Sequence, residues 1–147
     1  MPNGFWYASG PVNYREIKAA SAFSKGDLLT LDSNSSLSRL NPYAATTATQ
    51  YGVACSDSTN SINGVCTVAE ILPGSRWWSR TTSAVTLIRG EESGVSFVAA
   101  APGRYFVDES STTNIVVVDH GTAEVDQSVE SKVIVRFKYA DSELDLS

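Results

Sequence analysis

Residues that could carry out covalent or acid–base chemistry are few in this sequence. Its one histidine, His120, directly follows Asp119, and a serine–histidine–aspartate triad would need that carboxylate against the imidazole ring. Consecutive side chains of an extended chain point to opposite faces, so the two groups do not meet in this way. The Asp-His-Gly sequence after the apolar run 115–118 is instead typical of a turn.

Other candidate chemical groups are also poorly arranged. Acid–base catalysis needs two carboxyl groups in environments that separate their pKa values, whereas Glu91-Glu92 and Asp108-Glu109 have glycine or serine neighbours typical of solvated loops. A single histidine without a Cys-x-x-Cys pair predicts no metal centre. No glycine-rich phosphate-binding loop is present. We therefore expect neither enzymatic activity nor a cofactor.

Two cysteines, Cys55 and Cys66, flank the polar stretch 56–64. They could face each other across a hairpin, and a disulfide closing so short a loop would stabilise the fold by about 3 kcal/mol. The N-terminal residues lack the basic and apolar regions of a secretory signal, which predicts a reducing compartment. This favours free thiols over the disulfide, and both alternatives stay open.

Composition narrows the class of protein further. The chain has 147 residues and a net charge of -5, and 18% of its residues are charged. This length predicts one domain. An acidic chain without a basic stripe argues against direct binding of nucleic acid, whose phosphates must be neutralised. The apolar runs are too short to cross a membrane, so the composition is typical of a structural or binding module.

The pattern of residues predicts an all-β fold. No stretch has the 3.6-residue periodicity of an amphipathic helix, and short runs of β-branched and aromatic residues alternate with turn formers. We expect a hairpin over 25–40 and turns at Pro73-Gly74 and Pro102-Gly103. The apolar run 115–119 predicts a strand buried on both faces, and 132–139 alternates as a half-buried strand does. Many short antiparallel strands indicate a small β-barrel or sandwich.

The aromatic residues are the most informative feature. Residues 1–16 place Phe5, Trp6, Tyr7 and Tyr14 among glycine, proline and asparagine, which predicts an extended N-terminal arm ahead of a β-barrel domain at 17–140. The arm either lies on a partner or folds back over its own core. Residues 141–147 form an acidic C-terminal tail.

A second aromatic cluster is Trp77-Trp78, between Arg76 and Arg80. On a strand, one tryptophan points into the core and the other points outward. An outward tryptophan beside arginine is typical of a protein interface. It could equally stack on a sugar, as in a carbohydrate-binding β-sandwich that uses Trp77, Trp78 or Tyr105.

One stretch resembles a known family. Residues 19–32 read Ala-Ala-Ser-Ala-Phe-Ser-Lys-Gly-Asp-Leu-Leu-Thr-Leu-Asp, which resembles the opening of the capsid decoration, or cement, proteins of tailed bacteriophages. A polar turn, a returning strand, a small-residue connector and Gly52-Val53-Ala54 follow in the family's order. A strand ending in Pro-Gly, 65–74, continues the likeness, which covers residues 12–75.

The resemblance implies a small tulip-like β-barrel that is usually a homotrimer. Such a protein is made in the host cytoplasm and binds the outer capsid surface of the virion. There it clamps adjacent major capsid protein subunits and stabilises the expanded head. The residues expected to contact the capsid or neighbouring subunits are Phe5, Trp6, Tyr7, Tyr14, Trp77 and Trp78. Alternatives are a tail or head-completion protein, or the carbohydrate-binding module.

Overall fold

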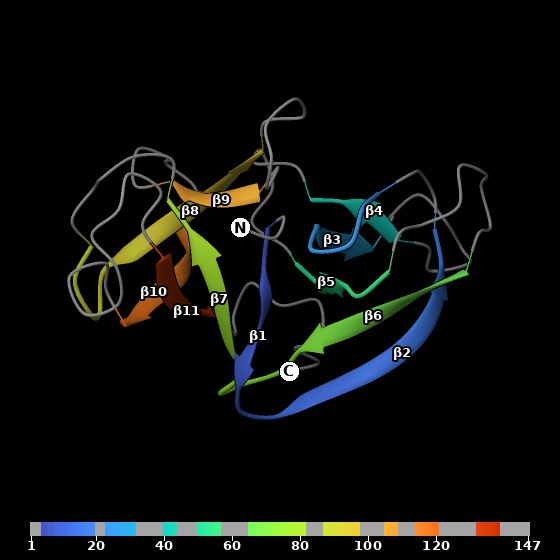
Figure 1. Cartoon of the computed structure of the whole chain (residues 1–147), viewed down its shortest axis with the longest axis horizontal. Helices are drawn as coiled ribbons and strands as arrows, with labels where there is room; N and C mark the ends of the chain where they lie inside the picture. Colours follow the sequence, from blue (N-terminus) through green and yellow to red (C-terminus); the bar gives the residue numbers. More distant parts are fainter. Residues whose placement is uncertain are drawn as a thin grey trace.

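All helices or strands that can be assigned in the described part of the chain are β-strands. The computed structural model describes residues 4–19, 23–31, 40–43, 50–56, 65–81, 87–97, 105–108, 114–120 and 132–138. Their strands form two antiparallel sheets (Figure 1), which confirms the predicted all-β domain of short antiparallel strands. Neither sheet, within these ranges, closes on itself, so two open sheets stand where a barrel was expected.

The first sheet has six strands in the order β1-β7-β11-β10-β8-β9. They are β1 (Trp6–Ser9), β7 (Arg76–Arg80), β8 (Glu92–Phe97), β9 (Tyr105–Asp108), β10 (Asn114–His120) and β11 (Lys132–Phe137). Of the two central strands, β11 follows its sequence pattern, whereas β10 is buried on one face and not on the predicted two. A register shift between Asn114 and Val116 turns neighbouring side chains of β10 into the main core, and Val117 stays half-buried on the other face. Ile115, Val116 and Val118 of β10 are buried, and in β11 buried Val133 and Val135 alternate with more exposed neighbours, as predicted.

The second sheet has five strands in the order β2-β6-β5-β3-β4. They are β2 (Val12–Lys18), β3 (Leu28–Leu31), β4 (Leu40–Pro42), β5 (Gly52–Ala54) and β6 (Val65–Ile71). The predicted hairpin is confirmed, because Leu31 pairs with Leu40 across β3 and β4. The turn predicted at Pro102-Gly103 lies outside the described residues.

One bent two-stranded ribbon joins the sheets. β1 pairs with β7 in the first sheet and β2 pairs with β6 in the second, so both strands of the ribbon change sheets at one corner (Figure 1). The corner contains Gly10 and the Pro73-Gly74 turn, and both glycines have a positive φ, of 90° and 83°. This φ region strains residues with a Cβ atom, so glycine lets the ribbon bend here.

The N-terminal segment is part of these sheets. β1 and β2 are edge strands, and the boundary expected at residue 16 falls inside β2. The backbone N–H of Phe5 donates a hydrogen bond to the carbonyl of Gly26 (3.0 Å), and the Phe5 side chain is only 2% exposed. Of the two alternatives for an arm, the structure has the one that folds onto its own domain.

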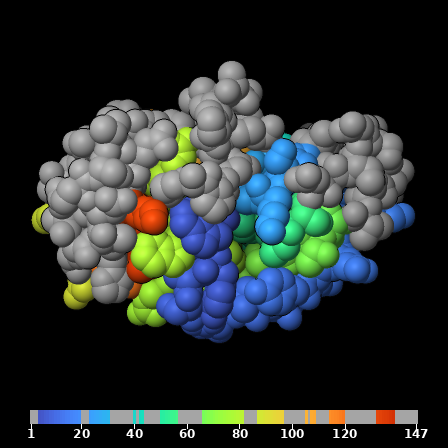
Figure 2. All heavy atoms as spheres, in the orientation of Figure 1, coloured from blue at the N-terminus to red at the C-terminus, as the bar shows by residue number. Residues whose placement is uncertain are grey.

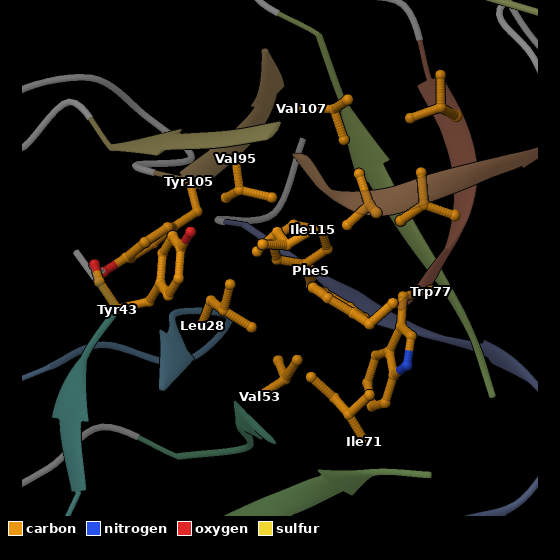
Figure 3. Close-up of a cluster of buried hydrophobic side chains, with 14 of the residues drawn as sticks. Phe5, Leu28, Tyr43, Val53, Ile71, Trp77, Val95, Tyr105, Val107 and Ile115 are labelled. Carbon is orange, nitrogen blue, oxygen red and sulfur yellow. Dashed lines mark hydrogen bonds between the residues drawn. The ribbon is translucent and has the colours of Figure 1, made fainter. Parts of the chain in front are cut away.

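The main core lies between the sheets. Figure 3 shows Phe5 near its centre, with Ile115 and Trp77 of the first sheet close by and Leu28 and Val53 contributed by the second. Aromatic rings fill much of this space because each buries a large apolar area. The ring of Phe5 packs on that of Phe137, with centroids 5.2 Å apart.

The inner strands of the five-stranded sheet are buried on both faces, whereas edge strand β2 is mostly exposed. Leu28 and Val53 belong to the main core, whereas the next residues along their strands, Leu29 and Ala54, belong to a second cluster, as alternation requires. The buried members of this second cluster are Ala19, Phe23, Leu29, Leu40, Tyr51, Ala54, Cys66 and Val68. Apolar side chains on both faces explain why the predicted hairpin reads as a nearly continuous apolar run.

Candidate functional site

The six aromatic residues predicted as a contact surface gather around the ribbon corner. They come from β1, β2 and β7, strands that are far apart in the sequence but neighbours in space. Phe5 and Trp77 (1% exposed) belong to the core and are not available to a partner. This corrects the expectation for these two residues, because β1 is an edge strand of the domain itself and directs Phe5 inward.

The other four aromatic residues reach the surface to different extents. Tyr14 is 56% exposed and Tyr7 is 39% exposed, while Trp6 and Trp78 are half-buried. The rings of Trp6 and Trp78 stack with centroids 6.3 Å apart and an interplanar angle of 15°. Stacking holds both rings in one orientation, so they form a preformed surface. We call Trp6, Tyr7, Tyr14 and Trp78 the edge aromatics.

The alternation predicted for Trp77-Trp78 is confirmed. Trp77 points into the core, where its indole N–H donates to the Ser75 hydroxyl (3.0 Å), and Trp78 points to the opposite face. Tyr105 is completely buried and its hydroxyl donates to the carbonyl of Tyr43 (2.6 Å). Trp77 and Tyr105 are therefore unable to act as stacking platforms for a sugar.

A pocket of about 450 Å³ lies beside the corner. Its buried wall includes Phe5, Val53 and Trp77, and its more exposed wall includes Tyr7, Tyr14 and Lys25. On the face seen in Figure 2, the dark-blue atoms of β1 lie between β7 on one side and residues 23–31 with β5 on the other. Apolar walls with one cation suit an apolar side chain or a small apolar ligand. We call this the corner pocket.

Sequence reasoning missed part of the corner pocket. Lys25, Gly26, Ala54 and Cys55 line it, although the motif that contains Lys25 and Gly26 was singled out for its order and spacing alone. The turn that holds them is fixed by backbone hydrogen bonds, from Gly26 to the carbonyl of Ala54 (2.8 Å) and from Ala54 to that of Asp27 (2.9 Å). The sequence signal for this turn was the glycine at position 26, because glycine readily adopts the positive φ, 92°, that the turn requires.

Both cysteines are free thiols. The backbone N–H of Cys55 donates to the carbonyl of Thr67 (2.9 Å), so Cys66 is one residue away from the position opposite Cys55. Cys55 packs against the main core and Cys66 lies in the second cluster, which places the two thiols on opposite faces of the sheet. Burial raises the pKa of both thiols, that of Cys66 to about 11, so neither is a ready nucleophile.

A buried acidic cluster on β6 was not predicted. Glu70 is 4% exposed, and its carboxylate accepts hydrogen bonds from the Tyr51 hydroxyl and from the Asn13 side-chain amide. The guanidinium of Arg15 lies 3.5 Å from the same carboxylate. A buried charge is tolerated when it is paired and hydrogen-bonded in this way. The cluster therefore fixes edge strand β2 to the sheet.

The acidic cluster predicts a defined pH dependence. Burial and the hydrogen bond to Glu70 raise the pKa of Tyr51 to about 12, from an ordinary value near 10. The folded state therefore holds this proton more tightly than the unfolded state does. The stabilisation is complete below about pH 10 and is lost as the pH rises from 10 to 12.

We expect Tyr51→Phe to lower the free energy of unfolding by about 1–3 kcal/mol at neutral pH, because Glu70 loses a buried donor. This deficit should shrink between pH 10 and 12, where the wild type loses its own contribution. Chemical denaturation at several pH values measures both effects, with exposed Tyr14→Phe as the control. A deficit that stays constant through this range would contradict the assignment.

The candidate chemical groups occupy structural contacts. The carboxylate of Asp119 accepts a hydrogen bond from Nε of Arg76 (2.7 Å), and that of Asp108 accepts one from the hydroxyl of Ser96 (2.7 Å). Glu91 accepts one from the backbone N–H of Ile88 (3.4 Å). In the ranges that the structure describes, no three His, Cys, Asp or Glu side chains are grouped as metal ligands. The same ranges hold no helix that could span a membrane.

Comparison with known proteins adds no family. No protein-family model and no curated protein sequence matches the chain.

Proposed function

We propose that this protein is a non-enzymatic structural component of a tailed-bacteriophage virion. It binds the outer surface of the capsid and clamps adjacent subunits of the major capsid protein in the expanded head. The main support for the proposal is that the resemblance in sequence coincides with one structural unit of the fold. The order of motifs that resembles capsid decoration proteins covers residues 12–75, and every strand of the five-stranded sheet, from Val12 to Ile71, lies within it.

The structural roles of the motif residues support this interpretation. Gly26 and Asp27 are buried in the turn before β3, where Asp27 accepts a hydrogen bond from the backbone N–H of Ser24 (2.9 Å). Leu28 and Leu29 then point to the two faces of the sheet. Gly52 begins β5 where an added Cβ would lie 2.5 Å from the carbonyl oxygen of Ala69. Each motif thus has a structural role in the five-stranded sheet, and the motifs follow one another in the chain in the order of the strands that contain them.

The edge aromatics and the corner pocket provide the proposed contact. Tyr7 and Tyr14 carry large apolar rings with a polar hydroxyl, which is the kind of side chain that contributes most at protein interfaces. The adjacent corner pocket accepts an apolar side chain from the partner. On a lattice of identical sites, neighbouring copies raise each other's effective concentration, so a modest interface is sufficient. We also propose a homotrimer, which places three such edges around one lattice point.

The test is binding to capsids assembled from the major capsid protein encoded with this chain. We expect the purified protein to co-sediment with expanded capsids and to give density on their outer surface in a cryo-EM reconstruction. Tyr14→Ala should weaken binding by about tenfold or more, because a central aromatic contributes about 2 kcal/mol at an interface. Ile88→Ser is the matched control, since Ile88 is 57% exposed but lies before β8, away from the corner.

Two outcomes would contradict the proposal. One is absence of the wild-type protein from expanded capsids at saturating concentration. The other is selective binding to a glycan array that depends on Trp78, which would favour the carbohydrate-binding alternative.

A further inference from the structure

The outward face of the six-stranded sheet has an unusual composition. Trp6 on β1 pairs with Trp78 on β7, and Trp78 pairs with Ile134 on β11. Paired residues of adjacent strands point to the same face, and all three side chains are half-buried. They form an apolar row across three neighbouring strands, on the face opposite the main core.

Cations lie next to this row. Arg136 is exposed and pairs with Val117 of β10, and Lys132 lies two residues before Ile134 on the same face of β11. Arg76 lies two residues before Trp78, and its guanidinium reaches across β11 to the carboxylate of Asp119. Lys138 is paired with Glu92, with 3.3 Å between Nζ and Oε1.

The charge of this face differs from that of the chain. Asp119 balances Arg76 and Glu92 balances Lys138. Lys132 and Arg136 add positive charge next to the apolar row, as does buried Arg80, the pairing partner of Lys132. Asp108 of β9 lies on the same face, at the far edge of the sheet. The whole chain, by contrast, has a net charge of -5. A cationic face on an acidic protein orients it toward a negatively charged partner surface.

We propose that this face, defined by Trp6, Trp78, Ile134, Lys132 and Arg136, binds an acidic protein surface that has an apolar centre. The inference rests on the proposed function for the identity of the partner, which is the major capsid protein. The apolar row supplies the desolvated centre of the interface and the cations supply its rim. Arg136 and Lys132 approach carboxylates of the partner, and the stacked Trp6 and Trp78 rings cover its apolar residues.

A protein partner fits this face better than nucleic acid does. Binding to DNA depends on neutralising many phosphates, and the few cations that the structure describes beside this apolar row are poorly suited to that task. Electrostatic complementarity at the rim of an interface mainly accelerates association and makes it sensitive to salt. The proposed contact therefore predicts a slower association rate with expanded capsids at higher ionic strength.

The experiment measures the affinity of full-length protein for expanded capsids at low and high salt. We expect Arg136→Glu to weaken binding by about tenfold or more at low salt, because it places like charges opposite each other. Arg136→Lys should retain most of the affinity. Lys18→Glu is the matched control, since Lys18 is an exposed cation at the end of β2 in the other sheet.

The possible results separate this inference from the proposed function. If the wild type does not bind capsids at all, the proposed function fails. If the wild type binds and Arg136→Glu binds equally well at every salt concentration, the proposed function stands and the assignment of this face is wrong. If duplex DNA binds to the wild type and not to Arg136→Glu, the face is a general anion site and the inference is also overturned. Unchanged thermal unfolding of each variant verifies that its fold is intact.

Discussion

Phe5→Ala is expected to lower the free energy of unfolding by about 3–5 kcal/mol, the range for deleting a buried phenylalanine side chain. The ring is 2% exposed and packs on Phe137 between the two sheets. A cavity at this point removes contacts from both sheets at once. Denaturant unfolding followed by tryptophan fluorescence measures the loss directly.

Tyr14→Ala is the control, because Tyr14 is 56% exposed and its replacement should change stability by no more than about 0.5 kcal/mol. The pair distinguishes a segment that belongs to the core from a segment that serves a partner. If Phe5→Ala were as stable as the wild type but unable to bind capsids, residues 4–7 would act as a detachable arm. The structure predicts instead that Phe5 is needed for folding and that Tyr14 is needed for binding.

The second large effect is expected at the ribbon corner. Gly10→Ala should destabilise the domain by about 2–5 kcal/mol, from two causes that add. A residue with a Cβ is strained at the positive φ of Gly10, by about 1–2 kcal/mol. The added Cβ would also lie 2.3 Å from the carbonyl oxygen of Gly74, and relieving such an overlap costs a further 1–3 kcal/mol or so.

Two other glycines separate these causes. Gly74 has a φ of 83° and its added Cβ would come no closer than 3.7 Å to Pro11, while Gly90 has a φ of 91° and no atom within 4 Å. Gly74→Ala and Gly90→Ala should therefore show the backbone strain alone. Equal losses in all three variants, measured by thermal unfolding, would mean that the close contact at the corner is not maintained in solution.

Local pattern was sufficient to predict much of this fold. The alternation in 132–138 predicted β11 and the apolar run 115–118 predicted β10, because each strand can be recognised from its own sequence of apolar and polar residues. The 25–40 hairpin followed from turn formers between apolar runs. Pairings between distant segments were not predicted. Nothing local in Trp6 indicates that it pairs with Trp78, or that the chain changes sheets at Pro73-Gly74 instead of returning as a hairpin.

The candidate site was predicted in composition but not in geometry. The six aromatic residues were identified as a candidate contact surface, but which of them are buried in the core depends on the direction of an edge strand. Tyr7 lies on the same face as buried Trp77, and Trp6 lies on the opposite face with Trp78, because β1 pairs with β7 in one register. Phe5 is buried, whereas Tyr7, on the edge strand, stays 39% exposed. Glu70 was missed, although a charged residue inside the apolar strand 65–71 already indicates a buried pair. Its partners, Tyr51 and Asn13, come from other strands.

The long ribbon also sets the order in which the protein can form during synthesis. β3, β4 and β5 precede β6 in the chain and can assemble as they leave the ribosome, because their partners are near in sequence. β1 and β2 precede these strands, but their partners β7 and β6 follow more than 45 residues later, as the pairing of Lys18 with Val65 shows. β1 and β2 therefore stay unpaired until β6 and β7 have been made, and the nascent chain presents them to chaperones or to sister polypeptides in the meantime.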